Sequence, residues 1–241
     1  MHSLEIILLL TAAGAGSLLA WILRNKTHIE LLQVLLSFTG AYLLSVTVTH
    51  LLPEVFEQGS GADVSFFILI GFFIQLLIVQ FTRGIEHGHL HLHHHFSKGY
   101  VSGVYFGLSI HALLEGMPLA EGVMHVHDGQ HIYYAILIHK LPEAFSLATI
   151  LFFSVRNKMY AWLLLLLFAL VTPAGALLSG WLSATDANHE IVWLMAIVCG
   201  TFIHISTTII FESSGKAHKI SWYKFLAIVL GVGFALMSFL L

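Results

Sequence analysis

The sequence has little charge. Only 10% of its 241 residues are Asp, Glu, Lys or Arg, whereas 58% are hydrophobic. Soluble domains carry roughly 25% charged residues, and a soluble chain of this composition would expose large apolar patches to water. The absence of a basic stripe excludes nucleic-acid binding. The composition therefore predicts a chain whose solvent is membrane lipid.

Cysteine and proline are also scarce. The single cysteine, Cys199, excludes an internal disulfide and a metal site built from several thiolates, and we expect it to be a core residue. All four prolines lie inside apolar segments, at Pro53, Pro118, Pro142 and Pro173. Each removes a helix hydrogen bond and kinks or breaks its helix. Interrupted helices at membrane depth occur where the backbone faces protein or a wet cavity, although for any single proline a structural kink is the simpler interpretation.

Long hydrophobic runs fill the chain. About 20 apolar residues span a bilayer, and we expect eight spans, at 4–23, 29–55, 64–81, 100–124, 132–155, 160–183, 191–211 and 221–240. The loops are too short for a separate soluble domain. The predicted fold is an all-α integral membrane protein in which residues 1–241 form one eight-helix transmembrane domain, with helices four and five kinked at Pro118 and Pro142 around a central site.

The loop charges alternate along the chain. Nine of the ten basic residues fall on the side of the odd loops, namely Arg24, Lys26, Arg83, Lys98, Arg156, Lys158, Lys216 and Lys219 within them and Lys224 just beyond the seventh loop. The even loops have none and carry Glu57, Asp63, Asp128, Asp186 and Glu190. Because cytoplasmic loops are rich in Lys and Arg, we expect a multi-pass protein of the plasma (inner) membrane with both termini outside.

Two neighbouring spans share a His-x-x-x-Glu pattern, His111 with Glu115 and His139 with Glu143. Residues four apart lie on one helix face, so two such helices supply two imidazoles and two carboxylates. These ligands suit Zn²⁺, and also Fe²⁺, Mn²⁺ or Cd²⁺, because ligand type alone does not select the metal. A charge at the bilayer centre costs at least ~2.5–3.5 kcal/mol, which disfavours the alternative of a polar pair that only locks two helices.

Further ionisable residues lie in or near the spans. His50 and Glu54 repeat the pattern near the outer end of the second span, and His204 and Glu212 lie eight residues apart in the seventh. They are candidates for an ion pathway, with partly hydrated interfacial residues as the alternative. Lys140 is the one basic residue placed inside a span, and we expect it beside the His and Glu ligands.

The loop between spans three and four is rich in histidine, at His87, His89, His91, His93, His94 and His95. Such tracts are typical of metal binding, and we expect a cytosolic loop that collects metal rather than a translocation site. A smaller cluster on the outer side, at His125, His127 and His131, is as consistent with a simple polar loop as with metal collection there.

These motifs resemble the ZIP family of metal transporters. His111 through Leu119 resembles the fourth-helix signature of that family, His139 through Ser146 the fifth-helix signature, and His50 through Glu54 the end of the second helix. The resemblance implies transport of Zn²⁺, and often Fe²⁺, Mn²⁺ or Cd²⁺, into the cytoplasm, with His111, Glu115, His139 and Glu143 as ligands. Many members bind a second metal beside the first, but this chain has Ala112, Lys140 and Thr172 at the corresponding positions, which argues against a second ion.

Two other functions compete with transport. A membrane di-metal oxidase of the desaturase or hydroxylase kind would use Glu and His ligands in a helix bundle, but it needs several histidine boxes and this chain has one cluster. A membrane metal sensor would need an output domain, and none is evident. The preferred metal, the energy source and the oligomeric state, including a homodimer, stay open.

Overall fold

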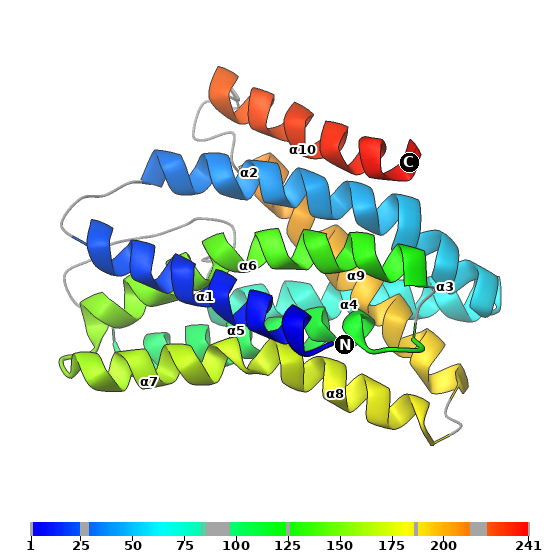
Figure 1. The fold of residues 1–241 in the computed structure, drawn as a ribbon, viewed down its shortest axis with the longest axis horizontal. Helices are drawn as coiled ribbons and strands as arrows, with labels where there is room; N and C mark the ends of the chain where they lie inside the picture. Colours follow the sequence, from blue (N-terminus) through cyan, green and yellow to red (C-terminus); the bar gives the residue numbers. More distant parts are fainter. Residues whose placement is uncertain are drawn as a thin grey trace.

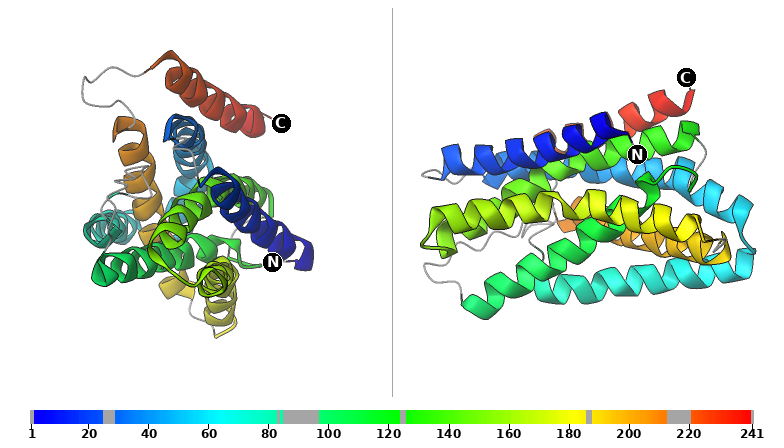
Figure 2. Two further views of the ribbon diagram at one scale, coloured as in Figure 1. Left: turned by 90° about the vertical axis from the view of Figure 1, so that its left-hand side faces the viewer. Right: turned by 60° about the horizontal axis from the view of Figure 1, so that its bottom comes forward.

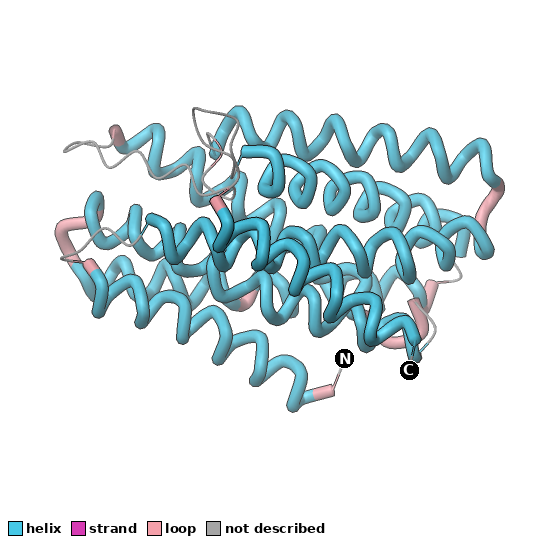
Figure 3. The backbone as a smooth tube through the Cα atoms, turned by 90° about the horizontal axis from the view of Figure 1, so that it is seen from above, coloured by secondary structure: helices cyan, strands magenta, loops and turns pink. Residues whose placement is uncertain are grey.

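The computed structural model describes residues 2–24, 29–82, 84, 97–123, 126–185, 188–212 and 221–240. Within these ranges the regular structure is entirely helical (Figure 3). The elements are α1 (Ser3–Leu23), α2 (Ile29–Val46), the π-helical turn η1 (Thr47–Leu51), α3 (Leu52–Gln58), α4 (Gly61–Thr82), α5 (Lys98–Gly116), the 3₁₀ turn η3 (Met117–Leu119), α6 (Val126–Ser154), α7 (Lys158–Ala169), α8 (Val171–Ser183), α9 (Asn188–Glu212) and α10 (Trp222–Leu240). Because α2, η1 and α3 are continuous and α7 and α8 meet at Leu170, the described residues form eight helical rods.

Most of these rods are long and apolar enough to cross a membrane. In the part of the chain that the structure describes, six meet this condition: α1, α2 to α3, α4, α6, α7 to α8, and α9. The other two are α10, which is apolar over the shorter stretch Trp222–Met237, and α5, which carries Lys98, His111 and Glu115. The expected all-α, multi-pass membrane architecture is confirmed.

The rods alternate in direction, so the chain returns to each end of the bundle in turn (Figure 1). One end, called the basic end below, carries Arg24 after α1 and the first residues of α5 and α7, Lys98 and Lys158. The other, the acidic end, carries Asp63 and Glu190 in the first turns of α4 and α9. The charge asymmetry in the sequence therefore corresponds to two opposite ends of the molecule.

The outer surface of the bundle is apolar between these ends. Large hydrophobic side chains are exposed along α4, α7 and α10, among them Phe66, Phe73, Leu163, Leu166 and Phe234. Exposed aromatic residues lie near the helix ends at Tyr160, Trp181, Trp222 and Tyr223. This arrangement matches a lipid-facing belt bordered by interfacial Trp and Tyr.

Helix α6 lies in the interior of the bundle. It packs along α1 on one side and contacts α2, α5 and α7 on the others, and the view along the helices places it near the middle, with α10 at the periphery against α2 (Figure 2). Its residues Ala144, Leu147, Ala148 and Leu151 are fully buried. Polar groups on α6 are thereby kept away from lipid.

Three of the prolines lie at or next to interruptions in the rods. Pro173 follows the α7–α8 junction, and α7 ends at Ala169, the residue whose carbonyl a proline four positions later crowds. Before Pro53 the helix widens into η1, where the Leu52 N–H donates to the Thr47 carbonyl five residues back. Helix α5 ends at Gly116, and Pro118 lies in the 3₁₀ turn that follows, so this helix is shorter than the expected span to Met124.

Candidate metal centre

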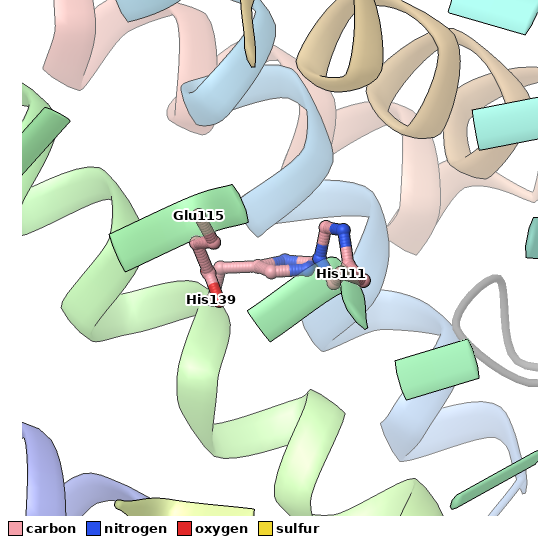
Figure 4. A group of neighbouring side chains, drawn as sticks. All are labelled: His111, Glu115 and His139. Carbon is pink, nitrogen blue, oxygen red and sulfur yellow. The ribbon is translucent and has the colours of Figure 1, made fainter. Parts of the chain in front are cut away.

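Three potential ligands converge between α5 and α6. His111 and Glu115 lie one turn apart on α5, His139 comes from α6, and their ligand atoms all lie within 4.8 Å of one another (Figure 4). All three side chains are buried. Among the described residues this is the only group of three or more His, Cys, Asp or Glu side chains close enough to hold one ion. Three of the four side chains of the paired motif thus lie together.

The two imidazoles are held at a defined angle. Their ring centroids lie 6.0 Å apart with the planes at 84°. Nδ1 of His139 also lies 3.3 Å from Oγ1 of the buried Thr39 on α2. A hydrogen bond to one ring nitrogen fixes the orientation of a metal-binding histidine and selects the nitrogen that faces the metal. Thr39, which the sequence did not single out, is therefore a positioning residue for His139.

Lys140 lies within the same cluster. Its Nζ donates to Glu115 Oε2 at 2.6 Å and also to Glu143 Oε2. The ammonium lies 5.3 Å from the centre of the Phe168 ring on α7, within cation–π range. The lysine side chain is 1% exposed. One buried cation thus bridges carboxylates from two helices at the point where the expected ligands meet.

Glu143 differs from the other three expected ligands. It is buried one turn after His139 but lies outside the three-residue group, with its Oε2 bonded to Lys140. Glu115 is bonded to Lys140 in the same way through its own Oε2, and its Oε1 is buried and accepts no hydrogen bond from the described residues. A carboxylate oxygen beside two imidazoles is a suitable ligand for a divalent transition metal.

Residues 97–241, more than half of the chain, match the family described as ZIP Zinc transporter. The chain belongs to the ZIP family. It is therefore a metal transporter and not an enzyme, and the expected family and the non-enzymatic function are confirmed. The matched region contains the cluster on α5 and α6. No curated protein matches the chain.

The three positions that the family resemblance relates to a second metal are poor in donors here. Ala112 is buried and has no ligand atom, and Lys140 presents an ammonium. Thr172 is also buried, at the start of α8, where its backbone carbonyl lies against Gly116. The Thr172 position therefore adjoins the cluster but supplies a hydroxyl in place of a carboxylate.

The other candidate residues of this ZIP chain lie apart from the cluster. His50 and Glu54 are buried in η1 and α3. His204 on α9 is buried and packs edge-on against Phe72 of α4, with ring centroids 4.6 Å apart. Outside the part that the structure describes lie His125, the side chains of His127 and Glu212, and the tract His87, His89, His91, His93, His94 and His95.

Two glycines allow α5 and α8 to approach closely beside Glu115. A Cβ on Gly116 would lie 2.0 Å from the Thr172 carbonyl oxygen, and one on Gly175 would lie 2.1 Å from that of Leu113. Contacts this short with backbone atoms cannot be relieved by moving a side chain. The position of Glu115 relative to α8 thus depends on both glycines.

Gly175→Ala is expected to destabilise the ZIP protein by at least about 1–3 kcal/mol, the usual cost of overpacking, and to reduce uptake strongly. Gly180→Ala on the same helix is the matched control, because its Cβ would meet Ala120 at an ordinary 3.6 Å. Thermal unfolding in detergent and uptake per folded molecule measure both effects. Equal stability and uptake of the two variants would contradict the packing argument.

Proposed function

We propose that this ZIP protein carries Zn²⁺, with Fe²⁺, Mn²⁺ and Cd²⁺ as further substrates, toward the cytoplasm through a site made by His111, Glu115, His139 and Glu143. The observation that supports it is the convergence of three buried ligands from two helices inside a membrane bundle. A buried His and Glu cluster is costly in a membrane unless it has a function. Transported metal supplies that function.

Glu143 enters the site in the proposed cycle by exchanging Lys140 for the metal. Both carboxylates are held by the same ammonium, so an arriving cation competes with Lys140 for the oxygens of Glu115 and Glu143. The two imidazoles, being neutral ligands, favour a transition metal over Ca²⁺ or Mg²⁺. Because the ammonium can replace the metal on the carboxylates, such a site binds the ion and can also release it.

The prolines would allow the two helices to move around this site. Pro118 follows the end of α5, and Pro142 lies within α6 between His139 and Glu143. Each removes a backbone hydrogen bond within four residues of a proposed ligand, and discontinuous helices are typical of transporter binding sites. We propose that helices four and five bend here as the site changes access, within a single eight-helix domain over 1–241.

The remaining ionisable residues fit a route on either side of the centre. His50 and Glu54 would lie on the outer side, and His204 and Glu212 on the way to the basic end. The histidine tract from His87 to His95 would collect released metal in the cytosol. This assignment follows the positive-inside orientation, with both termini outside the plasma (inner) membrane.

Uptake by purified protein in proteoliposomes tests the proposed function. We expect Zn²⁺ to accumulate with saturable kinetics and to be inhibited by the other three divalent ions, whereas Mg²⁺ and Ca²⁺ have little effect. Empty liposomes and protein-containing liposomes preloaded with a chelator provide the background and the maximal signal. Uptake no faster than that of empty liposomes would reject transport through this site.

Cysteine labelling tests the orientation. Cys199 is fully buried, so the unmodified protein should be labelled very little and the signal should come from the introduced cysteine. Ser60→Cys and Thr185→Cys at the acidic end should react with an impermeant maleimide in intact cells, and Asn157→Cys at the basic end should react only after permeabilisation. The reverse pattern would overturn both the orientation and the inward direction.

A further inference from the structure

Two histidines from distant parts of the chain meet toward the acidic end. The rings of His50 in η1 and His131 in α6 lie 4.4 Å apart between centroids, with their planes 30° apart. His50 is 4% exposed. His131 is partly buried. Two imidazoles in contact within a membrane bundle provide two nitrogen ligands for a transition metal.

This pair lies on the same helix seam as the central cluster. Helix α2 packs against α6, and Thr39 of α2 contacts His139 of α6. His131 precedes His139 by eight residues, which is about 12 Å along a helix. Helix α6 thus contacts α2 through His139 at the centre. About two turns nearer the acidic end it contacts η1, the continuation of α2, through His131.

The backbone of η1 bears on the position of His50. The Leu52 N–H bonds to the Thr47 carbonyl, five residues back, which adds one residue to the turn containing His50. An extra residue rotates the following face by about 100° relative to a regular helix. Such π-helical turns occur frequently at functional sites. Here the turn accompanies Pro53 and coincides with the contact between His50 and α6.

A carboxylate and a cavity continue the arrangement toward the acidic end. Glu54, one turn after His50, is 4% exposed, and its carboxylate accepts a hydrogen bond from Gln58 Nε2. Gln58 in turn lines a cavity of about 290 Å³ together with Ser183 and His189, near the ends of α3 and α8 and the start of α9. A cavity of this size has room for several water molecules. Polar groups thus lead from this cavity to the histidine pair.

We propose that His50 and His131 form a second, weaker divalent-metal site, with Glu54 as the neighbouring carboxylate, which an ion occupies before it reaches the central cluster. This site deepens the proposed transport function and rests on it. The three side chains do not form a compact three-ligand group in this conformation, so the ion would keep water ligands. Low affinity suits a transit site, because an ion must leave it readily.

Direct binding tests this site independently of transport. The starting variant carries His111→Ala, His139→Ala and a Ser/Gly replacement of residues 87–95, which removes both imidazoles of the central cluster and the histidine tract. We expect it to retain one weak site for Zn²⁺ or Co²⁺ by calorimetry, with a Co²⁺ absorption band typical of nitrogen ligands. Adding His131→Gln, which keeps a polar side chain of similar size, should remove that site.

Two controls identify the ligands. Adding His125→Ala with His127→Ala should leave the weak site intact, as should adding His2→Ala, an exposed histidine of the acidic end. Loss of the site in the double loop variant, or its persistence after His131→Gln, would overturn the proposal, because the metal would then be held elsewhere. Absence of any weak site in the starting variant would also overturn it and would show that the ring contact is only packing.

Transport kinetics give the second readout. With the central site intact, His131→Gln should raise the KM for Zn²⁺ uptake about 10-fold, by analogy with the 10–100-fold effects of altered metal surroundings, and leave the maximal rate nearly unchanged. An unchanged KM would refute the transit role. If the wild type transports no metal, the proposed function fails, whereas the binding experiment still decides whether the two histidines hold an ion.

Discussion

Alanine at position 139 or 143 should reduce metal uptake at least 10-fold while the protein still reaches the membrane. His139 supplies one of the three converging ligand atoms, and Glu143 follows one turn later on α6. Changes outside the first coordination shell already cost 10–100-fold in affinity, so loss of a ligand should cost no less. Initial uptake rates over a range of Zn²⁺ concentrations, normalised to the amount of protein in the membrane, measure the effect.

The two substitutions differ in what they leave behind. His139→Ala removes the contact with Thr39 as well as the ligand, whereas Glu143→Ala leaves Lys140 bonded to Glu115 alone. His2→Ala is the matched control, because His2 is an exposed histidine that precedes α1, outside the cluster and outside the proposed transit site. Near-normal uptake by both cluster variants would refute the site assignment, and a similar loss in the control would indicate a general defect.

Lys140→Met should destabilise the metal-free protein by about 3–5 kcal/mol, the usual effect of breaking a buried ion pair from one side. The substitution leaves Glu115 and Glu143 buried and close together without the cation that holds both. Added Zn²⁺ should then raise the midpoint of thermal unfolding more than in the wild type, because the metal replaces the lost positive charge. Lys158→Met, at an exposed lysine that donates to backbone carbonyls at the end of α6, should have a small effect.

The same lysine should limit the site to one ion. Two charges about 4 Å apart interact by several kcal/mol at an effective dielectric constant near 20, so the ammonium repels a second divalent ion. Equilibrium dialysis of a protein without the histidine tract and with His131→Gln should give one tightly bound Zn²⁺ per chain. Lys140→Asp should move this value toward two, although Ala112 and Thr172 provide no further carboxylate. Two tight ions without that substitution would contradict the single-ion interpretation.

The apolar runs and loop charges were sufficient to predict an all-α membrane bundle, because hydrophobic length and Lys and Arg asymmetry reflect the bilayer directly. The repeated His-x-x-x-Glu spacing likewise predicted that side chains of α5 and α6 would lie together, since spacing within one helix fixes a face, and three of the four do so. Contacts between helices were harder to predict. Thr39 beside His139 and Phe168 beside Lys140 depend on helix rotation and register, which nearly uniform apolar sequences do not encode.

Two further features depended on interactions that spacing alone does not describe. Glu143 was expected among the ligands and lies outside the compact group. Lys140 bonds to its Oε2 as it does to Oε2 of Glu115, and the His-x-x-x-Glu spacing does not describe this interaction. His131 belonged to a histidine cluster that was equally consistent with a polar loop. Its contact with His50 depends on the packing of η1 against α6, which the presence of Pro53 alone does not predict.

The Lys140 ammonium would also make the electrostatic cost of the loaded cluster similar to that of the empty cluster during a transport cycle. With Glu115, Glu143 and Lys140 all ionised, the empty cluster carries one net negative charge, and binding a divalent ion changes it to one net positive charge. The cost of placing charge in a poorly polarisable medium grows with the square of that charge. In the proposed cycle, loaded and empty carriers would therefore face similar barriers when they reorient. Without the lysine the loaded cluster would be neutral and the empty one doubly negative. The empty carrier would then reorient slowly unless another cation occupied the cluster.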